Sequence, residues 1–184
     1  GMRAVMPPSK IESIESKNFK INPNNCTHCS SNLNMKPAHT TQRPLIDSDY
    51  VAWLPLWQGY QAFYQINLSD AVTTKTWQRF LDPAEPMFAI GAFEDQRLVG
   101  IVHYIFHRSC WYEGPVCYLQ DLFTVIDRRG VGIGRSLIEG VYTEARLANA
   151  GRVYWLTHES NTPGRLLYDQ VAENAGFIQY RKNL

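Results

Sequence analysis

Three glycines and two arginines between positions 129 and 135 form the most chemically informative stretch of the sequence. Gly130, Gly132 and Gly134 alternate with apolar residues, and an amphipathic pattern follows them at once. A glycine loop that runs into a helix leaves the N–H groups of the first helical turn without partners, and these groups and the helix dipole attract anions. Glycine lets the backbone approach a phosphate closely, and Arg129 and Arg135 add positive charge. The stretch therefore predicts a phosphate-binding loop.

Two common nucleotide-binding motifs do not fit this loop. A Walker loop requires Gly-Lys followed by Ser or Thr, whereas this chain has Gly134-Arg135-Ser136 and a different glycine spacing. A dinucleotide-binding fingerprint belongs to the first strand–helix unit and needs an acidic residue about 20 positions later, which a loop this late in the chain does not supply. A glycine-bearing helix start without any ligand stays open as the structural alternative.

Hydrophobic periodicity and turn residues predict the elements that position the loop. Two helices are expected first, from Asp47 or Ser48 to Tyr64, with Pro55 and Gly59 as breaks or kinks, and from Ser69 or Asp70 to Leu81. The later elements are a hairpin over 87–93 and 98–106, a strand over 116–126, a helix closed by Gly151, a strand over 152–157, a helix over 162–175 and a strand over 177–180. This order predicts an α/β (α+β) fold, a mixed central β-sheet with helices on both faces.

Composition and charge narrow the class of protein. The chain is 45% hydrophobic and has a formal net charge of +1, so we expect one globular domain without a broad nucleic-acid or membrane-binding surface. No apolar run approaches the roughly 18 residues of a spanning helix, and a signal-peptide core is missing, which favours a cytoplasmic protein. Residues 1–40 are polar and form an N-terminal extension or arm, and the folded domain is expected over residues 41–184.

Cysteine usage does not predict a metal site. Cys26 and Cys29 form one knuckle, with His39 further along the same extension. Structural zinc sites need four ligands, usually from two such knuckles, so no metal is expected. Cys110 and Cys117 are interpreted as reduced structural thiols.

Several motifs occur in a consistent order over about three-quarters of the chain. They are Tyr-Leu-Gln-Asp-Leu-Phe-Thr-Val at 118–125, the loop 129–134 with its Arg-x-x-Gly-x-Gly spacing, Asn161, Leu167-Tyr168 and Gly176-Phe177. In these motifs the chain resembles the GCN5-related N-acetyltransferase (GNAT) superfamily, most of all its polyamine- and histone-acetylating branches. The resemblance implies the GNAT fold and the transfer of an acetyl group from acetyl-CoA to a primary amine by direct attack in a ternary complex. It also implies a homodimer.

The resemblance assigns residues to the cofactor as well. Backbone groups at 123–125 would pair with the pantetheine arm as an added strand would, and the N–H groups of residues 130–135 would hold the pyrophosphate. Asn161 would contact the cofactor, and Tyr168 would lie near the thioester sulfur. The implied cofactor-binding residues are Phe123, Thr124, Val125, Arg129, Gly130, Val131, Gly132, Ile133, Gly134, Arg135, Asn161 and Tyr168.

Acetyl transfer also needs a base for the amine and a proton donor for the departing thiolate. Tyr168 is the proton donor by its matching position, and a tyrosine that anchors the last helix is the structural alternative. Related polyamine enzymes carry Glu-Asp where this chain has Gln120-Asp121, and Gln120 cannot accept a proton. Successive strand residues face opposite sides, so the two cannot both face the substrate. We rank Asp121 first as base, with Gln120 orienting a water, and keep Glu113 and His158 as alternatives.

The acceptor is less defined by the sequence. Trp57, Tyr60, Tyr64 and Trp111 could line a pocket for a cationic amine through their ring faces, or could pack the first helix onto the sheet. The first two helices carry no dense acidic cluster, so a small-molecule amine or a protein lysine is as compatible as a polyamine.

Two further interpretations follow from single residue types. His103 and His107 alternate with apolar residues on a predicted strand, which is typical of packing or edge residues. The glutamine at position 120 supports an alternative function, a non-catalytic acyl-CoA-binding or regulatory domain that keeps the fold.

Overall fold

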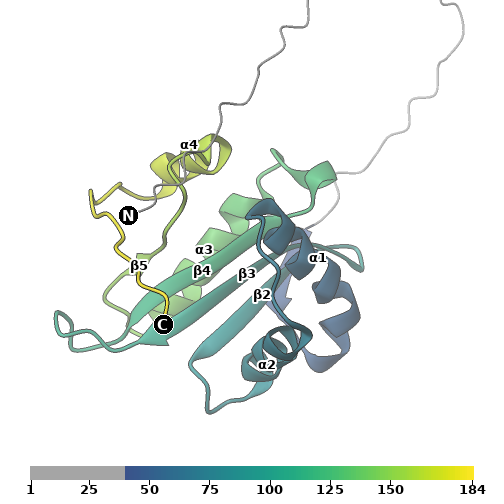
Figure 1. Cartoon of the computed structure of the whole chain (residues 1–184), viewed down its shortest axis with the longest axis horizontal. Coiled ribbons are helices and arrows are strands. Elements are labelled where there is room, and N and C mark those ends of the chain that lie inside the picture. The colour runs from purple at the N-terminus through teal and green to yellow at the C-terminus, as the bar shows by residue number, and fades with distance from the viewer. Residues whose placement is uncertain (1–39) are drawn as a thin grey trace, which may run out of the picture. The chain divides into compact units, whose positions relative to one another are not determined.

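The computed structural model describes residues 40–184, in which a five-stranded mixed sheet carries helices on both faces (Figure 1). The strands are β1 (Thr40–Pro44), β2 (Met87–Glu94), β3 (Arg97–His107), β4 (Val116–Thr124) and β5 (Val153–Tyr154). They lie in the order β1-β2-β3-β4-β5; the first four are antiparallel neighbours, and β5 runs parallel to β4. The mixed central sheet expected from the sequence is confirmed.

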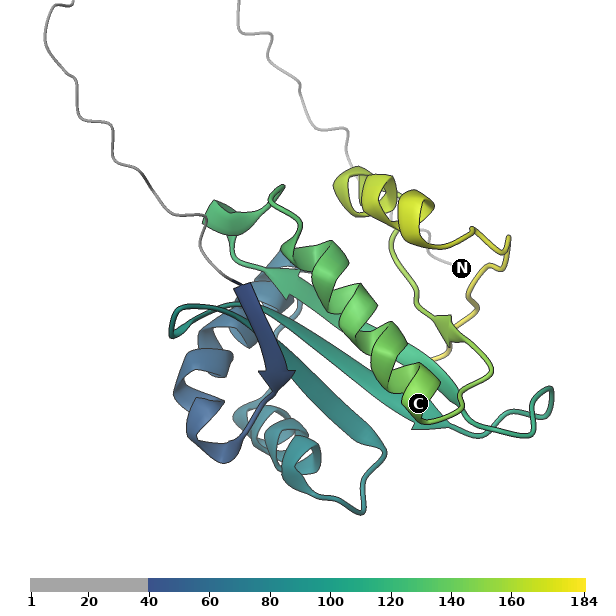
Figure 2. The same ribbon diagram turned by 180° about the vertical axis from the view of Figure 1, so that it is seen from behind.

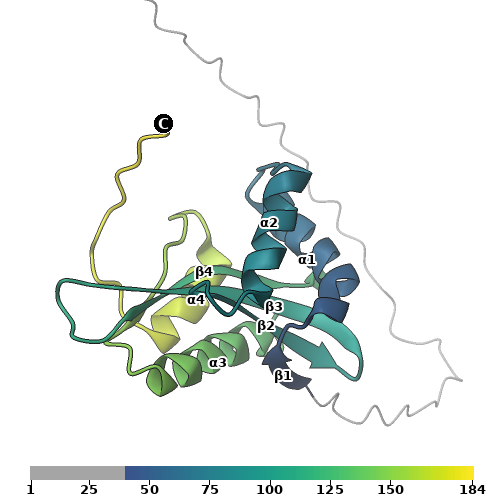
Figure 3. The same ribbon diagram turned by 90° about the horizontal axis from the view of Figure 1, so that it is seen from below.

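Four helices cover the sheet in two layers. Helices α1 (Tyr50–Phe63) and α2 (Asp70–Leu81) lie on one face, and α3 (Ile133–Leu147) and α4 (Thr162–Val171) lie on the other (Figure 3). Figure 2 shows α3 running along its face of the sheet, with α4 beside it. The chain passes from β4 through the glycine loop into α3, and α3 leads to β5, so a parallel strand–helix–strand unit surrounds the loop.

Each face of the sheet has its own hydrophobic core. The core under α3 is built around Leu137, Ile138 and Val141, none of which is exposed. The core under α1 and α2 is rich in aromatic rings and includes Trp53 and Trp77, which pack with ring centroids 4.9 Å apart. The sheet is thus packed on both faces, and the middle of β4 lies between the two cores.

Local signals explain most helix boundaries. The Ser69 hydroxyl accepts a hydrogen bond from the Val72 N–H and caps α2, as expected. Helix α1 runs through Pro55 without a break because Pro55 and Val51, whose carbonyl loses its usual i+4 donor, are both exposed to solvent. Helix α3 is closed by Asn149, which adopts a left-handed φ of +54°, and not by Gly151.

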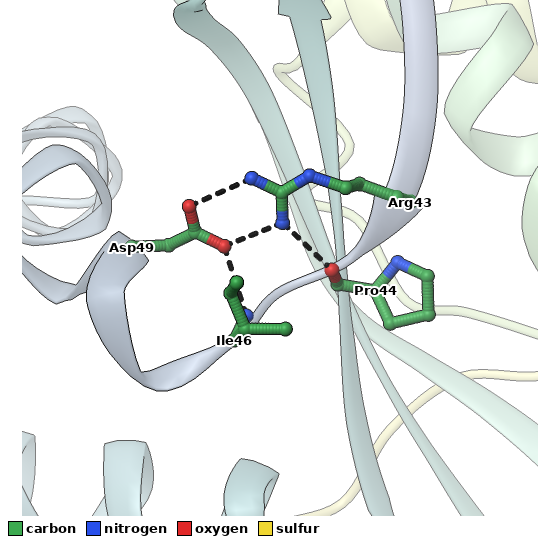
Figure 4. Close-up of polar contacts among 4 residues, drawn as sticks. All are labelled: Arg43, Pro44, Ile46 and Asp49. Carbon is green, nitrogen blue, oxygen red and sulfur yellow. Dashed lines mark hydrogen bonds and ion pairs between the residues drawn. The ribbon is translucent and has the colours of Figure 1, made fainter.

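An ion pair fixes the corner between β1 and α1 (Figure 4). The Arg43 guanidinium donates to both carboxylate oxygens of Asp49, at 2.6 and 2.8 Å, and also to the Pro44 carbonyl. Asp49 Oδ2 also accepts the Ile46 N–H at 2.8 Å. The hydrogen bonds from Arg43 hold the pKa of the buried Asp49 carboxyl below its ordinary value.

Strands that depend on long-range pairing were predicted least well. Strand β1 was not anticipated, β5 contains only Val153 and Tyr154, and α4 ends at Val171. The final strand predicted over 177–180 is wrong, because residues 172–184 form neither a helix nor a strand. Pairing with a neighbouring strand decides the three strand cases, and no local pattern encodes it. The early end of α4 is a separate error in a helix boundary.

The N-terminal extension and its cysteine knuckle lie outside the described residues. The expectations for Cys26, Cys29 and His39, and the boundary of the folded domain at residue 41, therefore stay predictions. No helix among residues 40–184 is long and apolar enough to cross a membrane.

Candidate functional site

The glycine loop forms a cradle of backbone N–H groups at the N-terminus of α3. Gly130 and Gly132 adopt φ of +78° and +94°, which side chains rarely tolerate, and the first bond of the helix runs from the Ser136 N–H to the Gly132 carbonyl. The N–H groups of residues 130–135 donate to no acceptor within the described chain. Unpaired N–H groups at the positive end of a 15-residue helix constitute an anion site.

Arginine side chains brace this cradle from two directions. Arg129 Nε donates to the Thr124 carbonyl at 3.1 Å, and its guanidinium lies 5.5 Å from the ring centre of Phe123. Arg135 donates to Gln170 and ties the start of α3 to α4. Both cations therefore stand beside the loop, one over β4 and one toward α4.

One edge of β4 is open next to the cradle. Strand β5 pairs with β4 only at Cys117 and Tyr118, so the edge beyond Tyr118 has no neighbour in the described chain. The Val125 N–H donates to Val99 of β3, and its carbonyl accepts the Arg128 N–H, so both of its backbone groups are occupied. By alternation, the groups of Leu122 and Thr124 face the open edge. An extended ligand chain can hydrogen-bond there as an additional strand.

A bulge in β4 decides which side chains face α1. His103 lies opposite Asp121, but Tyr104 lies opposite Leu119, so Gln120 is the extra residue. Gln120 is exposed, whereas Asp121 is only 6% exposed. The two neighbouring side chains therefore differ sharply in exposure. The bulge also shifts the alternation, which brings Tyr118 and Asp121 into proximity on one face although they are three residues apart.

Asp121 belongs to a buried polar chain that the sequence did not predict. Asp121 Oδ2 lies 3.0 Å from His103 Nδ1, and His103 Nε2 lies 3.0 Å from Trp53 Nε1. His103 is 2% exposed and Trp53 is not exposed at all. His103 is therefore not a simple packing residue. The available signal was a polar side chain in an otherwise apolar strand, but the partner became visible only with the strand register.

Four tyrosines from three elements interact with one another, and two of them, Tyr60 and Tyr118, also interact with Asp121. Tyr60 and Tyr64 come from α1 and its C-terminus, Tyr118 from β4 and Tyr168 from α4. Burial, followed by the charge of Asp121 and a hydrogen bond to it, raises the pKa of Tyr60. Burial and then the charge of Asp121 also raise the pKa of Tyr118. Burial and then the interaction with Tyr64 raise the pKa of Tyr168 to about 12.

The predicted aromatic pocket is brought together only in part. Trp57 is 4% exposed and stacks on Tyr60 with ring centroids 5.5 Å apart, so it supports the tyrosine cluster from the core. Trp111 is 72% exposed on the loop between β3 and β4, which projects beyond the sheet away from α1 (Figure 1). The Arg152 guanidinium lies over the Trp111 ring there, 5.6 Å from its centre. Tyr60 is thus the member of the predicted set that interacts with Asp121, and Tyr64 packs on Tyr60 with ring centroids 5.0 Å apart.

The remaining predicted site residues hold the segment between β5 and α4. Asn161 caps α4 by accepting the Gly164 N–H, and its amide donates to Thr157 Oγ1 at 3.0 Å. Tyr168 packs edge-on against Trp155, with ring centroids 5.4 Å apart. Of the alternative bases, His158 is exposed and hydrogen-bonded to Ser160, and Glu113 lies exposed on the β3–β4 loop. Neither is buried as Asp121 is.

Metal chemistry has no candidate ligand set in the described part of the chain. No group of three or more His, Cys, Asp or Glu side chains is arranged to hold an ion among residues 40–184. Cys117 is buried, which raises the pKa of its thiol to about 12. Cys110 is an exposed free thiol on the β3–β4 loop.

Comparisons with known proteins identify the family to which the chain belongs. The model of the acetyltransferase (GNAT) family matches residues 53–172. The chain is 35% identical over 137 residues to the D-amino-acid N-acetyltransferase HPA3 of Saccharomyces cerevisiae, an alignment that covers 73% of this chain and 85% of that protein.

Solved structures agree on the fold. A ribosomal-protein-alanine N-acetyltransferase from Brucella melitensis biovar Abortus 2308 superposes with a TM-score of 0.63 at 22% identity, over 79% of this chain and all of that one. The aminoglycoside N-acetyltransferase AAC(6')-Iy in complex with CoA superposes with a TM-score of 0.69 at 18% identity, over 83% of this chain and all of that one.

Proposed function

The chain belongs to the GNAT acetyltransferase family and is an N-acetyltransferase, and we propose that it transfers the acetyl group of acetyl-CoA to a primary amine held beside Asp121. The observation that carries this proposal is the cradle of unpaired N–H groups at 130–135, which lies next to an open edge of β4. An anion site and an extended hydrogen-bonding edge side by side fit the pyrophosphate and the pantetheine arm of one CoA molecule.

The amine is proposed to enter from the face of α1. The buried carboxylate of Asp121 provides the negative charge for an ammonium group, and the rings of Tyr60 and Tyr64 offer electron-rich faces next to it. Before the attack, Asp121 accepts one proton from the ammonium and releases it to solvent, which leaves a neutral amine with a free electron pair. As this nitrogen attacks the thioester carbonyl and the C–N bond forms, it loses a second proton to solvent. Gln120, on the exposed side of the bulge, is proposed to orient water.

Tyr168 is proposed to donate a hydrogen bond to the departing sulfur. When the C–S bond breaks, the electron pair stays on sulfur, which then gains a proton. A phenol with a pKa of about 12 stays protonated at neutral pH, whereas a typical thiol has a pKa of about 8.5. Tyr168 therefore stabilises the thiolate as a hydrogen-bond donor, and complete proton transfer follows from solvent.

The acceptor is proposed to be a small primary amine, and D-amino acids are included because the 35% identical relative is named for them. Within the described residues, no Arg or Lys contacts Asp121 or its tyrosines, so an amine without a neighbouring carboxylate fits the cluster at least as well. A protein lysine, a homodimer and a cytoplasmic location stay predictions.

Release of free CoA over a panel of amines tests the function. The panel contains small monoamines, polyamines, D- and L-amino acids and a lysine peptide, each with acetyl-CoA and the full-length chain. Tyr168→Phe should lower kcat by about 10²–10³-fold, the effect of losing one hydrogen-bond donor to a developing anion, while the dissociation constant of CoA changes little. If acetyl-CoA binds but no amine releases CoA, the chain is a sensor of acyl-CoA, as Gln120 suggested. If acetyl-CoA does not bind, the cradle has been misinterpreted.

A further inference from the structure

Three buried side chains from three different elements form one hydrogen-bonded series. Trp53 of α1, His103 of β3 and Asp121 of β4 are joined by two contacts of 3.0 Å, and none is more than 6% exposed. The series ends at the tyrosine cluster, where Tyr60 interacts with Asp121. Its position therefore links the core under α1 to the proposed amine site.

The order of donors and acceptors in this series is fixed by chemistry. An indole nitrogen can only donate, so His103 Nε2 must accept the bond from Trp53 and cannot carry a proton. The proton of a neutral imidazole is then on Nδ1, which donates to Asp121 Oδ2. Protonation at Nε2 would break the bond to Trp53 inside a dry core, so the series holds His103 neutral and in one tautomer.

We propose that His103 is a positioning residue for the acetyl transfer, and that Trp53 locks it in the tautomer that donates to the Asp121 carboxylate. The inference rests on the proposed function. His103 is not the base; it donates to Asp121 Oδ2 and thereby fixes the orientation of the carboxylate that interacts with Tyr60 and Tyr118. A donor to a carboxylate favours the ionised form, which is the form that can bind an ammonium and accept its proton.

Packing energetics argue for a role beyond stability. A buried polar pair can usually be replaced by apolar residues of similar volume at little or no cost, so such a pair is weak evidence of a stabilising purpose. His103 is surrounded by apolar and aromatic groups, with the ring of Phe80 from α2 4.5 Å away and that of Trp57 from α1 5.3 Å away. Apolar residues in place of the whole series would satisfy this environment, whereas an apolar residue at 103 alone would leave the Trp53 N–H and the Asp121 carboxylate without this partner. The histidine is therefore explained by the two groups that it joins.

Few other titratable groups face the carboxylate. Tyr60 and Tyr64 approach from α1, Tyr118 from β4 and His103 from β3, and α2 contributes only apolar rings. The tyrosines stay neutral over the range of the assay because burial raises the pKa of Tyr60 and Tyr118. A change in the acidic limb of the activity profile therefore reports on the Asp121–His103 pair.

Histidine NMR on the wild-type full-length chain tests the tautomer directly, without any substrate. Long-range ¹H–¹⁵N spectra at pH 7 should show His103 Nδ1 protonated and Nε2 unprotonated, and the signals are assigned by their loss in His103→Asn. A protonated Nε2, alone or together with Nδ1, would overturn the proposal. Because no turnover is needed, this outcome is independent of whether the proposed function holds.

Kinetics test the positioning role. His103→Leu should lower kcat/KM at pH 7 by about 10- to 100-fold, the change that corresponds to one charge-assisted hydrogen bond, and should move the acidic limb of the pH profile to higher pH. His103→Asn keeps an N–H donor, so the pH dependence of its kcat/KM should be close to that of the wild type. Trp53→Phe should shift the limb as well, whereas Trp77→Phe, an equally buried truncation that leaves the series intact, should not. A His103→Leu enzyme with the wild-type profile would show that His103 is structural only.

Discussion

Replacing Gly132 with alanine isolates the contribution of one backbone conformation to cofactor binding. Gly132 adopts φ of +94° directly before α3, and a Cβ added there would meet no atom within 4 Å. The substitution creates no steric clash in the free protein. Its effect comes from the preference of alanine for negative φ, which costs about 1–2 kcal/mol.

That cost appears either in folding or in binding. If the loop keeps its conformation, the free energy of unfolding falls by about 1 kcal/mol, because alanine also restricts the unfolded chain and thereby returns about 0.4–1 kcal/mol. If the loop relaxes to negative φ, CoA must restore the strained conformation, and its dissociation constant should rise about 5- to 30-fold. The increase in the free energy of unfolding that CoA produces should be smaller than in the wild type, in line with the weaker binding.

Urea unfolding and calorimetric titration with CoA distinguish these outcomes on the full-length chain. Gly140→Ala is the matched control, since Gly140 lies in the same helix at an ordinary φ. Its added Cβ would come close only to the flexible end of Gln42, and Ile90 would be at an ordinary contact distance of 3.8 Å. The control should leave the CoA dissociation constant within about twofold. Wild-type unfolding together with wild-type CoA binding in Gly132→Ala would refute the assignment of the left-handed loop as the pyrophosphate cradle.

Three further predictions concern the scaffold and its pH dependence. Gly59→Ala should lower the free energy of unfolding, measured in urea, by about 1 kcal/mol. The added Cβ would lie 2.7 Å from Phe123 Cζ, and the cost of overpacking, about 1–3 kcal/mol, exceeds the gain in helix propensity. Phe123→Leu in the same chain should relieve the loss. Asp49→Asn should lower the free energy of unfolding by about 1.5–3 kcal/mol at pH 7. Because Arg43 lowers the pKa of Asp49 in the folded state, this stabilisation is complete above the pKa of Asp49 in the unfolded chain and is lost as the pH falls through the folded pKa. Urea titrations of the two proteins should therefore converge as the pH falls below about 4. Asn149→Ala should lower the melting temperature by about 2–4 °C and Asn149→Gly should change it little, since φ is +54° there; equal effects of the two would contradict the left-handed closure of α3.

Local chemistry made part of this structure predictable from the sequence. The cap at Ser69, the turn between β2 and β3 and the amphipathic face of α3 depend on neighbours within a few residues, and all three are found where they were expected. The glycine cradle is local in the same sense. Its positive φ values at Gly130 and Gly132 are conformations that glycine adopts without strain.

The buried series could not be predicted because it depends on register. Nothing near His103 in the sequence indicates that it lies opposite Asp121, 18 residues away, and the bulge at Gln120 changes the alternation that a regular strand would have. A regular strand would separate Tyr118 and Asp121 on opposite faces. Asp121, which the sequence ranked first as the base, is buried, but its partner His103 was not predicted.

The bulge also explains why the two halves of the proposed reaction meet where they do. The open edge of β4 begins immediately after Tyr118, where β5 stops pairing, and the bulge at Gln120 lies just beyond it. A ligand chain that follows this edge from the cradle at α3 must end there, because β5 occupies the edge further on. Next to this bulge, Asp121 lies on the face of the sheet that carries α1, where it is hydrogen-bonded to His103 of β3. The end of β5 and the bulge in β4 thus bring the start of the open edge and the buried carboxylate to neighbouring positions of one strand.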